Sequence, residues 1–299
     1  MTMLVLVTGA QGQVGRELLQ RAPPGFSVIG YGSGDLDISD RAQVREILAR
    51  IKPQLLINAA AYTAVDKAES EVERAYGVNR DGVAHLALAA EELGIPLLHI
   101  STDYVFSGDS DSAYQPGDVT APSGVYGLSK LAGEQQLQQH CSRHVILRTS
   151  WVFGAHGNNF VKTMLRLGRD RDELAVVADQ RGCPTSAGSI ADTLWALASI
   201  FQRDGALKWG LYHYSGAPAC TWYDFADEIF SQALTQGLLE KRPSLKAITT
   251  TEYPTPAKRP AWSVLDCQAL EHAHGLAPQS WTRELQQVLQ QLRETAPHG

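Results

Sequence analysis

The fold of this chain can be inferred from Leu4-Val5-Leu6-Val7-Thr8-Gly9-Ala10-Gln11-Gly12-Gln13-Val14-Gly15. The apolar run Leu4–Val7 has the length of a buried strand, and the glycines after it allow a tight turn into a helix. Glycines also let the backbone approach a diphosphate, which the N–H groups and the dipole of a helix N-terminus attract. The spacing is GxxGxxG instead of the commoner GxGxxG. Strand, glycine loop and helix in this order predict a nucleotide site.

Outward from this loop, short apolar runs alternate with longer segments of helical period. The strand-like runs are Leu4–Val7, Phe26–Tyr31, Leu55–Asn58, Leu97–Ser101 and Val145–Thr149. The helix-like segments are Val14–Arg21, Arg41–Ile51, Ala68–Leu93 and Val125–His140. Strands that alternate with helices form βαβ units, so the expected fold class is α/β, with a Rossmann-like doubly wound parallel sheet.

The alternation loosens from about Trp151 onward, where aromatic, proline and arginine residues gather in predicted loops. Two more strand-like runs, Leu174–Val177 and Leu211–Tyr214, continue the pattern, and helical period returns near Trp281–Leu292. We therefore expect an NAD(P)-binding Rossmann domain over residues 1–150. Residues 151–299 are expected to form mainly a smaller substrate-binding region, interleaved with the last sheet strands.

Composition argues against several classes of protein. The 299 residues are 44% hydrophobic and 19% charged, as in globular domains, and a net charge of −6 disfavours a nucleic-acid binder. The pattern contains no signal peptide and no apolar run long enough for a membrane span, so the expected location is the cytoplasm. Nine histidines show no metal-ligand spacing, and no metal-ligating residue is predicted. The cysteines lack CxxC spacing, which favours reduced thiols. They are Cys141, Cys183, Cys220 and Cys267.

Two short motifs in the first half predict chemistry at a carbonyl group. Tyr126 and Lys130 are four apart on a predicted helix and so project from one face. A ketone reductase needs a proton donor at the oxygen. A free phenol has a pKa near ~10, and a nearby ammonium would ease its proton donation. Thr102 ends a predicted strand, where open α/β sheets bind ligands, and its hydroxyl can reach the same oxygen. Taken alone, the helix motif also fits a solvated face, and Thr102 a turn residue.

Together these residues resemble the extended short-chain dehydrogenases/reductases. The resemblance is carried by the glycine loop, Asn58-Ala59-Ala60, Asn79, Ser101-Thr102 and the Tyr126/Lys130 pair. Further stretches are similar to one family within this class, the dTDP-4-dehydrorhamnose reductases. They are Ala61-Tyr62-Thr63-Ala64-Val65-Asp66-Lys67-Ala68-Glu69, Ser101-Thr102-Asp103-Tyr104-Val105-Phe106, Arg148-Thr149-Ser150-Trp151-Val152, Gly157-Asn158-Asn159-Phe160, Asp179-Gln180-Arg181-Gly182-Cys183-Pro184-Thr185, Thr221-Trp222-Tyr223, and Arg259-Pro260 followed by Ser263. The match runs from Thr8 to about Leu292.

The resemblance implies an activity, which is hydride transfer from NADPH to the C4 ketone of dTDP-4-dehydro-β-L-rhamnose. This is the last step of dTDP-L-rhamnose biosynthesis. The resemblance implies Thr102, Tyr126 and Lys130 as catalytic residues, with Lys130 also holding the nicotinamide ribose. The residues expected along the cofactor, besides Tyr126 and Lys130, are Gly9, Gln11, Gly12, Gln13, Val14, Gly15, Asp35, Leu36, Ala61, Tyr62 and Thr63.

The resemblance also implies contacts to the dTDP-sugar, made by Thr102 and Tyr126 together with three further residues. Asp103 and Trp151 are expected at the sugar, with the carboxylate accepting hydrogen bonds and the indole forming an apolar wall. Arg259 is expected at the diphosphate, because its planar guanidinium can bind such oxygens bidentately. The alternatives are that Trp151 fills the core and that Arg259 belongs to a surface ion pair. Trp222 also fits the core.

NADPH is the expected cofactor, with NADH as a second. The second predicted strand ends Ile29-Gly30-Tyr31-Gly32-Ser33, without a carboxylate where an NAD enzyme would bind the ribose 2′-hydroxyl. A 2′-phosphate would not be repelled there, and Ser33 and Arg16 are candidate contacts. Tyr31 fits equally as a packing residue.

Some members of the resembled family form a dimer around Mg²⁺ held by three glutamates. Glu17 and Glu284 match two of these positions, whereas the third falls at Gly188, which has no carboxylate. Mg²⁺ requires oxygen ligands in octahedral geometry, and the loss of one carboxylate weakens such a site. We therefore expect that turnover does not require Mg²⁺. Glu17 would also be favoured by the helix dipole alone. A homodimer is left open, and no nucleic-acid or membrane partner is expected.

Two rival functions stay open at this stage. The same scaffold serves other nucleotide-sugar reductases and epimerases, and an epimerase would retain its NAD. Some relatives bind and regulate another enzyme without catalysis of their own. Such a homologue would usually have lost part of the catalytic set, which is complete in this sequence.

Overall fold

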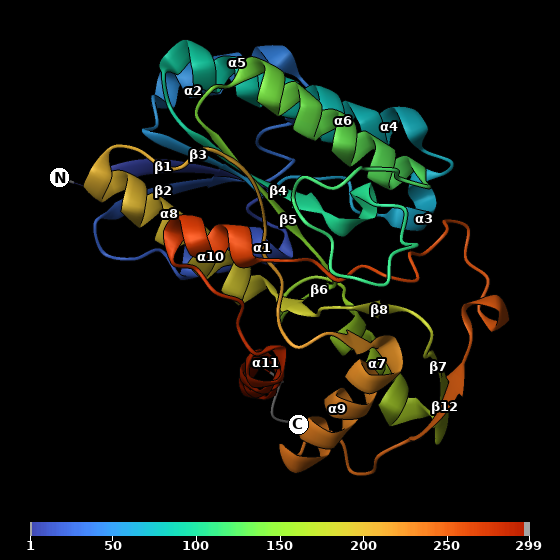
Figure 1. Ribbon diagram of the computed structural model, residues 1–299. Helices are drawn as coiled ribbons and strands as arrows, with labels where there is room; N and C mark the ends of the chain where they lie inside the picture. Colours follow the sequence, from blue (N-terminus) through green and yellow to red (C-terminus); the bar gives the residue numbers. More distant parts are fainter. Residues whose placement is uncertain (1, 296–299) are drawn as a thin grey trace.

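Six parallel strands form the central sheet of the chain, whose computed structural model describes residues 2–295. The strands are β1 (Met3–Thr8), β2 (Phe26–Tyr31), β3 (Leu55–Asn58), β4 (Leu97–Thr102), β5 (His144–Thr149) and β10 (Gly210–His213). They lie in the order β10-β5-β4-β3-β1-β2, and every neighbouring pair is parallel (Figure 1). This confirms the predicted Rossmann-like α/β class. The order reverses between β1 and β3, so a ligand site is expected beyond the carboxyl ends of those strands.

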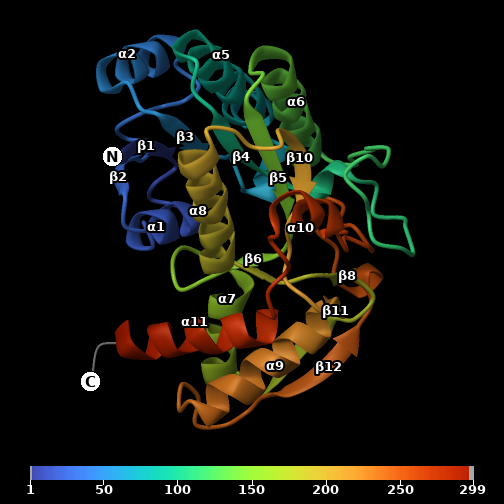
Figure 2. The same cartoon turned by 60° about the vertical axis from the view of Figure 1, so that its left-hand side comes forward.

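Successive strand residues enter opposite helix layers. Val5 and Val7 of β1 pack into one core, and Leu6 packs into the other. The layer around Val5 and Val7 contains α1 (Gln13–Gln20), α8 (Ala187–Asp204) and α10 (Gln268–His274), and the layer around Leu6 contains α2 (Arg41–Ile51), α5 (Val83–Leu93) and α6 (Val125–His140) (Figure 2). Each fully buried side chain of this kind contributes about 1.5–3 kcal/mol. The strands are therefore apolar on both faces, as the sequence indicated.

The segment 68–93, predicted as one helix, is broken. The structure has α3 (Val65–Ala68), α4 (Val72–Tyr76), the π-helical turn η1 (Gly77–Gly82) and then α5. The wider turn brings Asn79 against α6, where a Cβ on Gly133 would lie only 2.0 Å from the Asn79 carbonyl oxygen. The apolar period continues through all these pieces, so periodicity alone could not show the breaks.

Part of the second half builds a lobe below the sheet, apart from α8, α10 and β10 (Figure 1). Its helices α7 (Phe160–Asp170), α9 (Trp222–Thr235) and α11 (Trp281–Thr295) share a core that includes Phe225 and Leu285. The predicted strand at 174–177 exists as β7 (Glu173–Val177), but it pairs with β12 (Ser244–Ile248) outside the main sheet. The predicted run 211–214 does join the main sheet, as β10. The short elements are β6 (Val152–Phe153), β8 (Arg181–Gly182), β9 (Thr185–Ser186), β11 (Cys220–Thr221), η2 (Asp103–Val105) and η3 (Thr250–Glu252).

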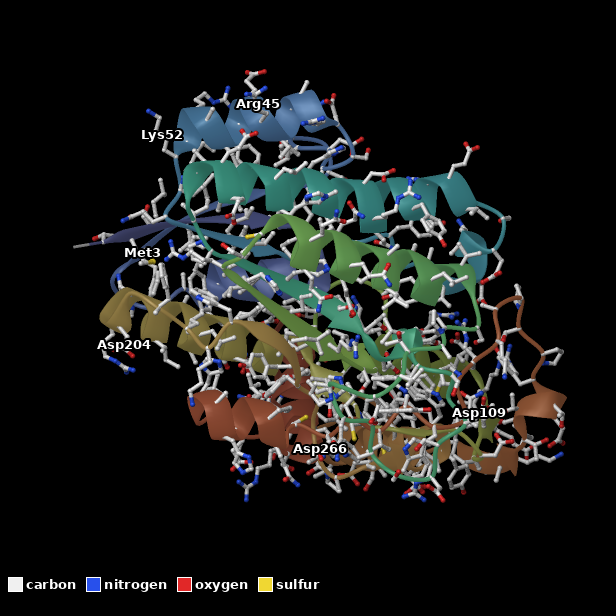
Figure 3. The ribbon with its side chains drawn as sticks, turned by 45° about the horizontal axis from the view of Figure 1, so that its top comes forward. Met3, Arg45, Lys52, Asp109, Asp204 and Asp266 are labelled. Carbon is white, nitrogen blue, oxygen red and sulfur yellow. The ribbon has the colours of Figure 1, made fainter. Side chains whose placement is uncertain are left out.

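Charged side chains occupy the outer surfaces of the helices. Figure 3 shows Arg45 and Lys52 projecting away from the body of the protein at α2, and both are exposed. Within residues 2–295, no helix combines the length and apolarity needed to cross a membrane.

Candidate active site

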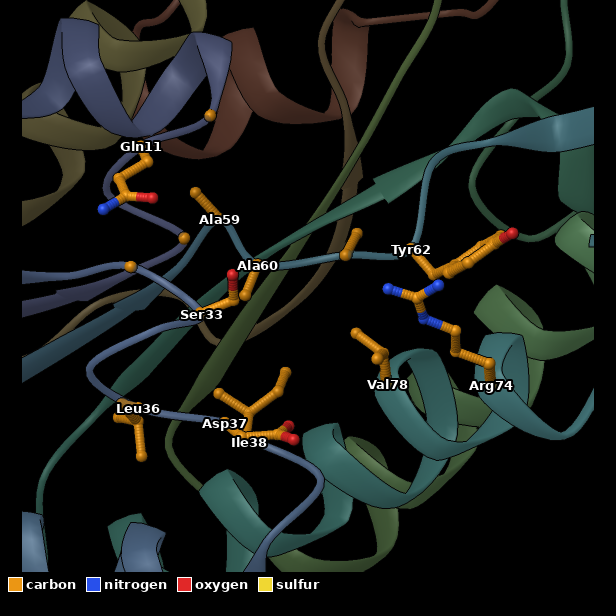
Figure 4. A pocket seen from close by; sticks show the side chains of 14 residues that line it. Gln11, Ser33, Leu36, Asp37, Ile38, Ala59, Ala60, Tyr62, Arg74 and Val78 are labelled. Carbon is orange, nitrogen blue, oxygen red and sulfur yellow. The ribbon is translucent and has the colours of Figure 1, made fainter. Parts of the chain in front are cut away.

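A cavity of about 280 Å³ lies beyond the carboxyl ends of β1, β2 and β3 (Figure 4). Gly9 and Gly12 of the glycine loop form one wall, and Ala61 and Tyr62 form another. Gly9 has a positive φ of 71°, and a Cβ there would lie 2.5 Å from the backbone nitrogen of Ala60, so only glycine fits. Gly12 is the N-cap of α1 and provides no side-chain cap, which leaves the first N–H groups of the helix free for an anion.

The structure places some of the predicted cofactor residues on this cavity and others beside it. Those on the cavity are Gly9, Gln11, Gly12, Leu36, Ala61 and Tyr62. Val14 and Gly15 lie beneath the loop, where a Cβ on Gly15 would approach the Gly9 carbonyl oxygen to 2.1 Å. They pack α1 against the loop and do not line the cavity.

The remaining predicted cofactor residues outside α6, Gln13, Asp35 and Thr63, do not line the cavity either. Gln13 accepts a hydrogen bond from the side chain of Asn159 at 2.9 Å, which draws it toward the second lobe. The Asp35 carboxylate accepts from the Gly32 N–H at 3.2 Å and so closes its own turn. Thr63 is exposed.

Several cavity residues were not predicted from the sequence. Ser33 had been named as a contact for a 2′-phosphate, and Gly32, Ala59 and Ala60 had been quoted within motifs but given no role. The full set is Gly32, Ser33, Asp37, Ile38, Ala59, Ala60, Arg74 and Val78. Gly32 and Ser33 follow β2, and Ala59 and Ala60 follow β3. These four could have been found by the rule that ligands bind beyond the carboxyl ends of the strands. Arg74 and Val78 come from α4 and η1, whose approach to the cavity depends on the break in the predicted long helix.

Asn79, carried by η1, fixes the wall of the cavity to α6. Its side-chain oxygen accepts from the Tyr62 N–H at 2.9 Å, and its amide nitrogen donates to the Tyr62 carbonyl at 3.1 Å. The same nitrogen donates to the Ser129 hydroxyl at 3.0 Å. The cavity wall and the helix that carries Tyr126 and Lys130 are thereby held in register.

Thr102, Asp103 and Tyr126 meet where β4 ends and α6 begins. The Thr102 hydroxyl donates to Asp103 Oδ1 at 2.9 Å, and the Thr102 side chain lies close enough to the Tyr126 phenol to lower its pKa. The ring of Tyr104 packs edge-on against that of Tyr126, with centroids 5.4 Å apart. This approach requires Gly127, because a Cβ there would lie 2.2 Å from the Tyr104 carbonyl oxygen.

Burial shifts the pKa values of these groups. It raises the pKa of Tyr126 well above its ordinary value, and the Thr102 side chain opposes this rise only in part. Burial also raises the pKa of Asp103 to about 7, against the lowering effect of the Thr102 hydrogen bond. Among residues 2–295, Asp103 Oδ2 has no hydrogen-bond partner. A buried polar atom without a partner costs free energy, so Oδ2 is the unsatisfied polar atom of this group.

Lys130 lies on the Tyr126 helix with only 2% of its surface exposed. Its Nζ donates to the Ile100 carbonyl at 2.7 Å and lies 3.4 Å from His99 Nε2. Burial lowers the pKa of Lys130 to about 8, although the nearby Glu134 carboxylate opposes this. The expected lowering of the Tyr126 pKa by Lys130 is not found in the free protein, where burial dominates.

A buried ion pair anchors α6 one turn beyond Lys130. Glu134 accepts two hydrogen bonds from the Arg148 guanidinium, at 2.9 and 2.7 Å, and one from the Ser101 hydroxyl at 2.5 Å. These groups join α6 to β4 and β5. Because Ser101 precedes Thr102 and Glu134 follows Lys130, the ion pair fixes the two halves of the site relative to each other. Removing one partner of a buried pair typically costs about 3–5 kcal/mol.

Trp151 and Trp222 form a stacked pair on the side of the second lobe. Their ring centroids are 3.6 Å apart, and the planes differ by 6°. The Trp151 indole N–H donates to Ser263 at 3.0 Å, and both tryptophans are half-buried. A Cβ on Gly182 would lie 2.4 Å from the Trp151 ring, so this glycine makes room for the pair. Trp222 therefore belongs to the same aromatic surface as Trp151.

Arg259 pairs with an acidic residue in the free protein. Its guanidinium donates to Asp66 Oδ2 at 2.7 Å and lies 3.4 Å from the Tyr104 hydroxyl. Since Tyr104 packs on Tyr126, Arg259 is separated from the Tyr126 ring by one side chain. Both the ion pair and a position next to the site are thus observed.

The residues at the expected Mg²⁺ position do not fit the ion. The Arg21 guanidinium occupies this place and donates to Glu17 at 2.7 Å and to Asp192 at 2.8 Å. A Cβ on Gly188 would lie 2.6 Å from Arg21, so a larger residue there would displace this cation. Glu284 accepts from the Ser186 hydroxyl at 2.6 Å. Within residues 2–295, no group of three or more His, Cys, Asp or Glu side chains could hold a metal.

The parallel sheet, the glycine-loop cavity at its switch point and the Thr102/Tyr126/Lys130 cluster define an extended short-chain dehydrogenase/reductase. A family model described as the RmlD substrate binding domain matches residues 3–294. The chain belongs to this family, the dTDP-4-dehydrorhamnose reductases.

Named relatives cover nearly the whole chain. It is 47% identical to a dTDP-4-dehydrorhamnose reductase from Aggregatibacter actinomycetemcomitans, over 95% of this chain and 97% of that protein. It is 43% identical to the enzyme of the same name from Escherichia coli K12, over 98% and 99%. The crystal structure of the Bacillus anthracis dTDP-4-dehydrorhamnose reductase in complex with NADP has a TM-score of 0.89 and 35% identity, over 97% of this chain and 100% of that one.

Proposed function

We propose that this protein reduces the C4 ketone of dTDP-4-dehydro-β-L-rhamnose to give dTDP-L-rhamnose, with hydride from NADPH. This is the final step of dTDP-rhamnose biosynthesis for cell-surface polysaccharides such as lipopolysaccharide. The observation that carries the proposal is the meeting of Thr102 and Tyr126 at the carboxyl edge of the sheet, beside a cavity shaped by the glycine loop. The names of relatives that match the full chain support the same substrate.

We assign the chemical roles as follows. Tyr126 donates its proton to the oxygen of the reduced ketone, and its raised pKa keeps it protonated until that oxygen becomes a strong base. Thr102 orients the ketone oxygen. Lys130 holds the ribose beside Tyr126 and supplies charge to it. A bound nicotinamide would supply the hydride.

Binding groups surround this centre. The free Oδ2 of Asp103 accepts a sugar hydroxyl, and Trp151 forms the apolar wall of the sugar site. Arg259 binds the diphosphate of the substrate. On the cofactor side, the proposed residues are those predicted from the resemblance, and the residues that line the cavity are the most direct candidates. Contacts far from the reacting carbon would contribute binding energy that orients the ketone.

The deciding experiment is NADPH oxidation by the purified protein with enzymatically prepared dTDP-4-dehydrorhamnose, followed by identification of the product. We expect dTDP-L-rhamnose and one NADPH consumed for each ketone. Tightly bound NAD and an epimerised product would instead indicate an epimerase. No turnover would favour a regulatory homologue.

NADPH is expected to be used at least as well as NADH. Ser33 lines the cavity at the end of β2, and Arg16 donates to the carbonyl of Gln11, which also lines the cavity, at 3.1 Å. A carboxylate at position 33 would repel a 2′-phosphate, so Ser33→Asp should lower kcat/KM for NADPH by about tenfold or more and spare NADH. Asp37→Asn is the matched control. It removes a carboxylate that also lines the cavity and should not weaken NADPH use. A preference of about tenfold for NADH in the unmodified protein would overturn this assignment.

Turnover is expected not to require Mg²⁺, because Arg21 already pairs with Glu17 and Asp192. We further propose a cytoplasmic enzyme whose dimer, if it forms, persists without the metal. The protein should be treated with EDTA, and its activity and its mass by light scattering should then be measured. Both should stay unchanged. Loss of either, restored by adding Mg²⁺, would show that the remaining carboxylates bind the ion.

A further inference from the structure

A chain of buried polar side chains lies behind the candidate active site. The Thr8 hydroxyl donates to Asn58 Oδ1 at 2.7 Å, and Asn58 Nδ2 lies 2.9 Å from His99 Nδ1. His99 Nε2 lies 3.4 Å from Lys130 Nζ. All four side chains are buried. The chain crosses the sheet from β1 through β3 and β4 to α6, and it ends at a proposed catalytic residue.

The direction of these hydrogen bonds can be worked out from one backbone group. The Ala60 N–H donates to Asn58 Oδ1 at 3.0 Å, and a backbone N–H can only donate. The atom it reaches must therefore be the amide oxygen, and the amide nitrogen of Asn58 must face His99. His99 Nδ1 is then an acceptor. Burial holds the pKa of His99 well below its ordinary value, so the ring is neutral and carries its proton on Nε2.

The Nε2–H of His99 points at Lys130 Nζ, which already donates to the Ile100 carbonyl. An ammonium group has three donors and no acceptor, so it has nothing to offer this N–H. A neutral amine has one lone pair and two N–H groups. It can accept from His99, donate to Ile100 and keep one N–H for a ligand. The groups that face Lys130 Nζ therefore match a neutral amine and not an ammonium.

We propose that His99 is a positioning residue that donates its Nε2–H to the amine form of Lys130. The proposal rests on the roles proposed above for Tyr126 and Lys130. After Tyr126 gives its proton to the substrate oxygen, the ammonium of Lys130 gives a proton to the phenolate. This restores the phenol and leaves an amine, which His99 stabilises. A proton from solvent then restores the ammonium, so one proton is consumed for each ketone reduced.

The charged groups around Lys130 do not stabilise its amine form. On the same helix, Glu134 favours the ammonium, and it is engaged by Arg148. His144 on β5 acts on His99, and Asp103 and Tyr104 of η2 act on Tyr126. Among the charged or titratable groups of other elements packed on α6, Glu69 accepts from the Val125 N–H at the start of the helix. Others are paired with groups outside α6, namely Arg80 with Asp81, Arg74 with Glu71, Asp66 with Arg259, and His85 with the Ile38 carbonyl. His99 is the group whose N–H reaches Lys130.

The first test is the pH dependence of kcat with saturating NADPH and substrate. Lys130→Arg cannot lose its proton in the working range, so the limb of the profile that disappears in this variant belongs to Lys130. In His99→Leu the amine loses its donor, and this limb should move up by about one pH unit, or about tenfold in the ratio of the two forms. His99→Gln can still donate from its amide and should stay near the unmodified protein. A downward shift in His99→Leu would mean that His99 accepts from the ammonium, and no shift would mean that it only fills space. Either result overturns the proposal.

The second test does not depend on a folded leucine variant or on turnover. The ¹⁵N NMR signals of the histidine rings are recorded with and without NADPH, and His99 is assigned by comparison with His99→Gln. We expect a neutral ring with its proton on Nε2. A proton on Nδ1, or an imidazolium, would overturn the proposal. This result is independent of the proposed reaction, which fails separately if Tyr126→Phe retains turnover.

Discussion

Tyr126→Phe is expected to lower kcat by about 10²–10⁴-fold, the usual range for loss of a general acid. The phenylalanine ring keeps the edge-on contact with Tyr104, and only the phenol oxygen is removed. Burial raises the pKa of Tyr126, so the phenol holds its proton until hydride transfer makes the substrate oxygen basic. The measurement is the single-turnover rate of NADPH oxidation with dTDP-4-dehydrorhamnose.

The control is Tyr212→Phe on β10, whose hydroxyl donates to the Lys208 carbonyl outside the site. It removes the same atom and should leave kcat unchanged. Both variants should remain folded in thermal unfolding, and both should still bind NADPH. A Tyr126→Phe protein with near-normal kcat would show that another group, or water, supplies the proton.

The helix and strands that carry the catalytic residues were predictable because their patterns are local. The segment 125–140 was expected as one helix and is α6, and the strand predicted over Leu97–Ser101 is β4 (Leu97–Thr102), which ends at Thr102. The Tyr126/Lys130 spacing placed both residues on one helix. The meeting of Thr102 with Tyr126 followed from a general rule for sheet edges. These features need only a few residues of sequence to be seen.

Features that depend on contact between distant segments were not predictable from local patterns. The π-helical turn at 77–82 places Asn79 against Tyr62 and Ser129, neither of which is near it in sequence. β7 pairs with β12 and not with the main sheet, a choice that strand propensity cannot make. The lowered pKa of Lys130 depends on its burial between α6 and β4, which no local pattern shows. Arg21 fills the expected metal position by bridging α1 and α8.

Arg259 offers the second large effect, because its ion pair and its proposed role can be separated. Arg259→Ala should weaken binding of the nucleotide-sugar by about 10–100-fold, since hydrogen bonds to charged groups contribute about 1.5–3 kcal/mol. NADPH affinity should remain unchanged, because Arg259 contacts Asp66 and Tyr104 and does not line the cofactor cavity. Both affinities can be measured by calorimetry with dTDP and with NADPH.

Asp66→Asn is the matched variant, because it removes the carboxylate charge and leaves the guanidinium in place. The oxygen of the introduced amide could still accept from the Ala257 N–H, which in the unmodified protein donates to Asp66 Oδ1 at 3.2 Å, so the loop should stay closed. If Arg259 binds the diphosphate, this change frees its charge, and dTDP should bind as well as before or more tightly. If the ion pair itself matters, Asp66→Asn should weaken binding as much as Arg259→Ala does. A parallel loss of dTDP and NADPH affinity in Arg259→Ala would assign Arg259 to the fold or the cofactor site.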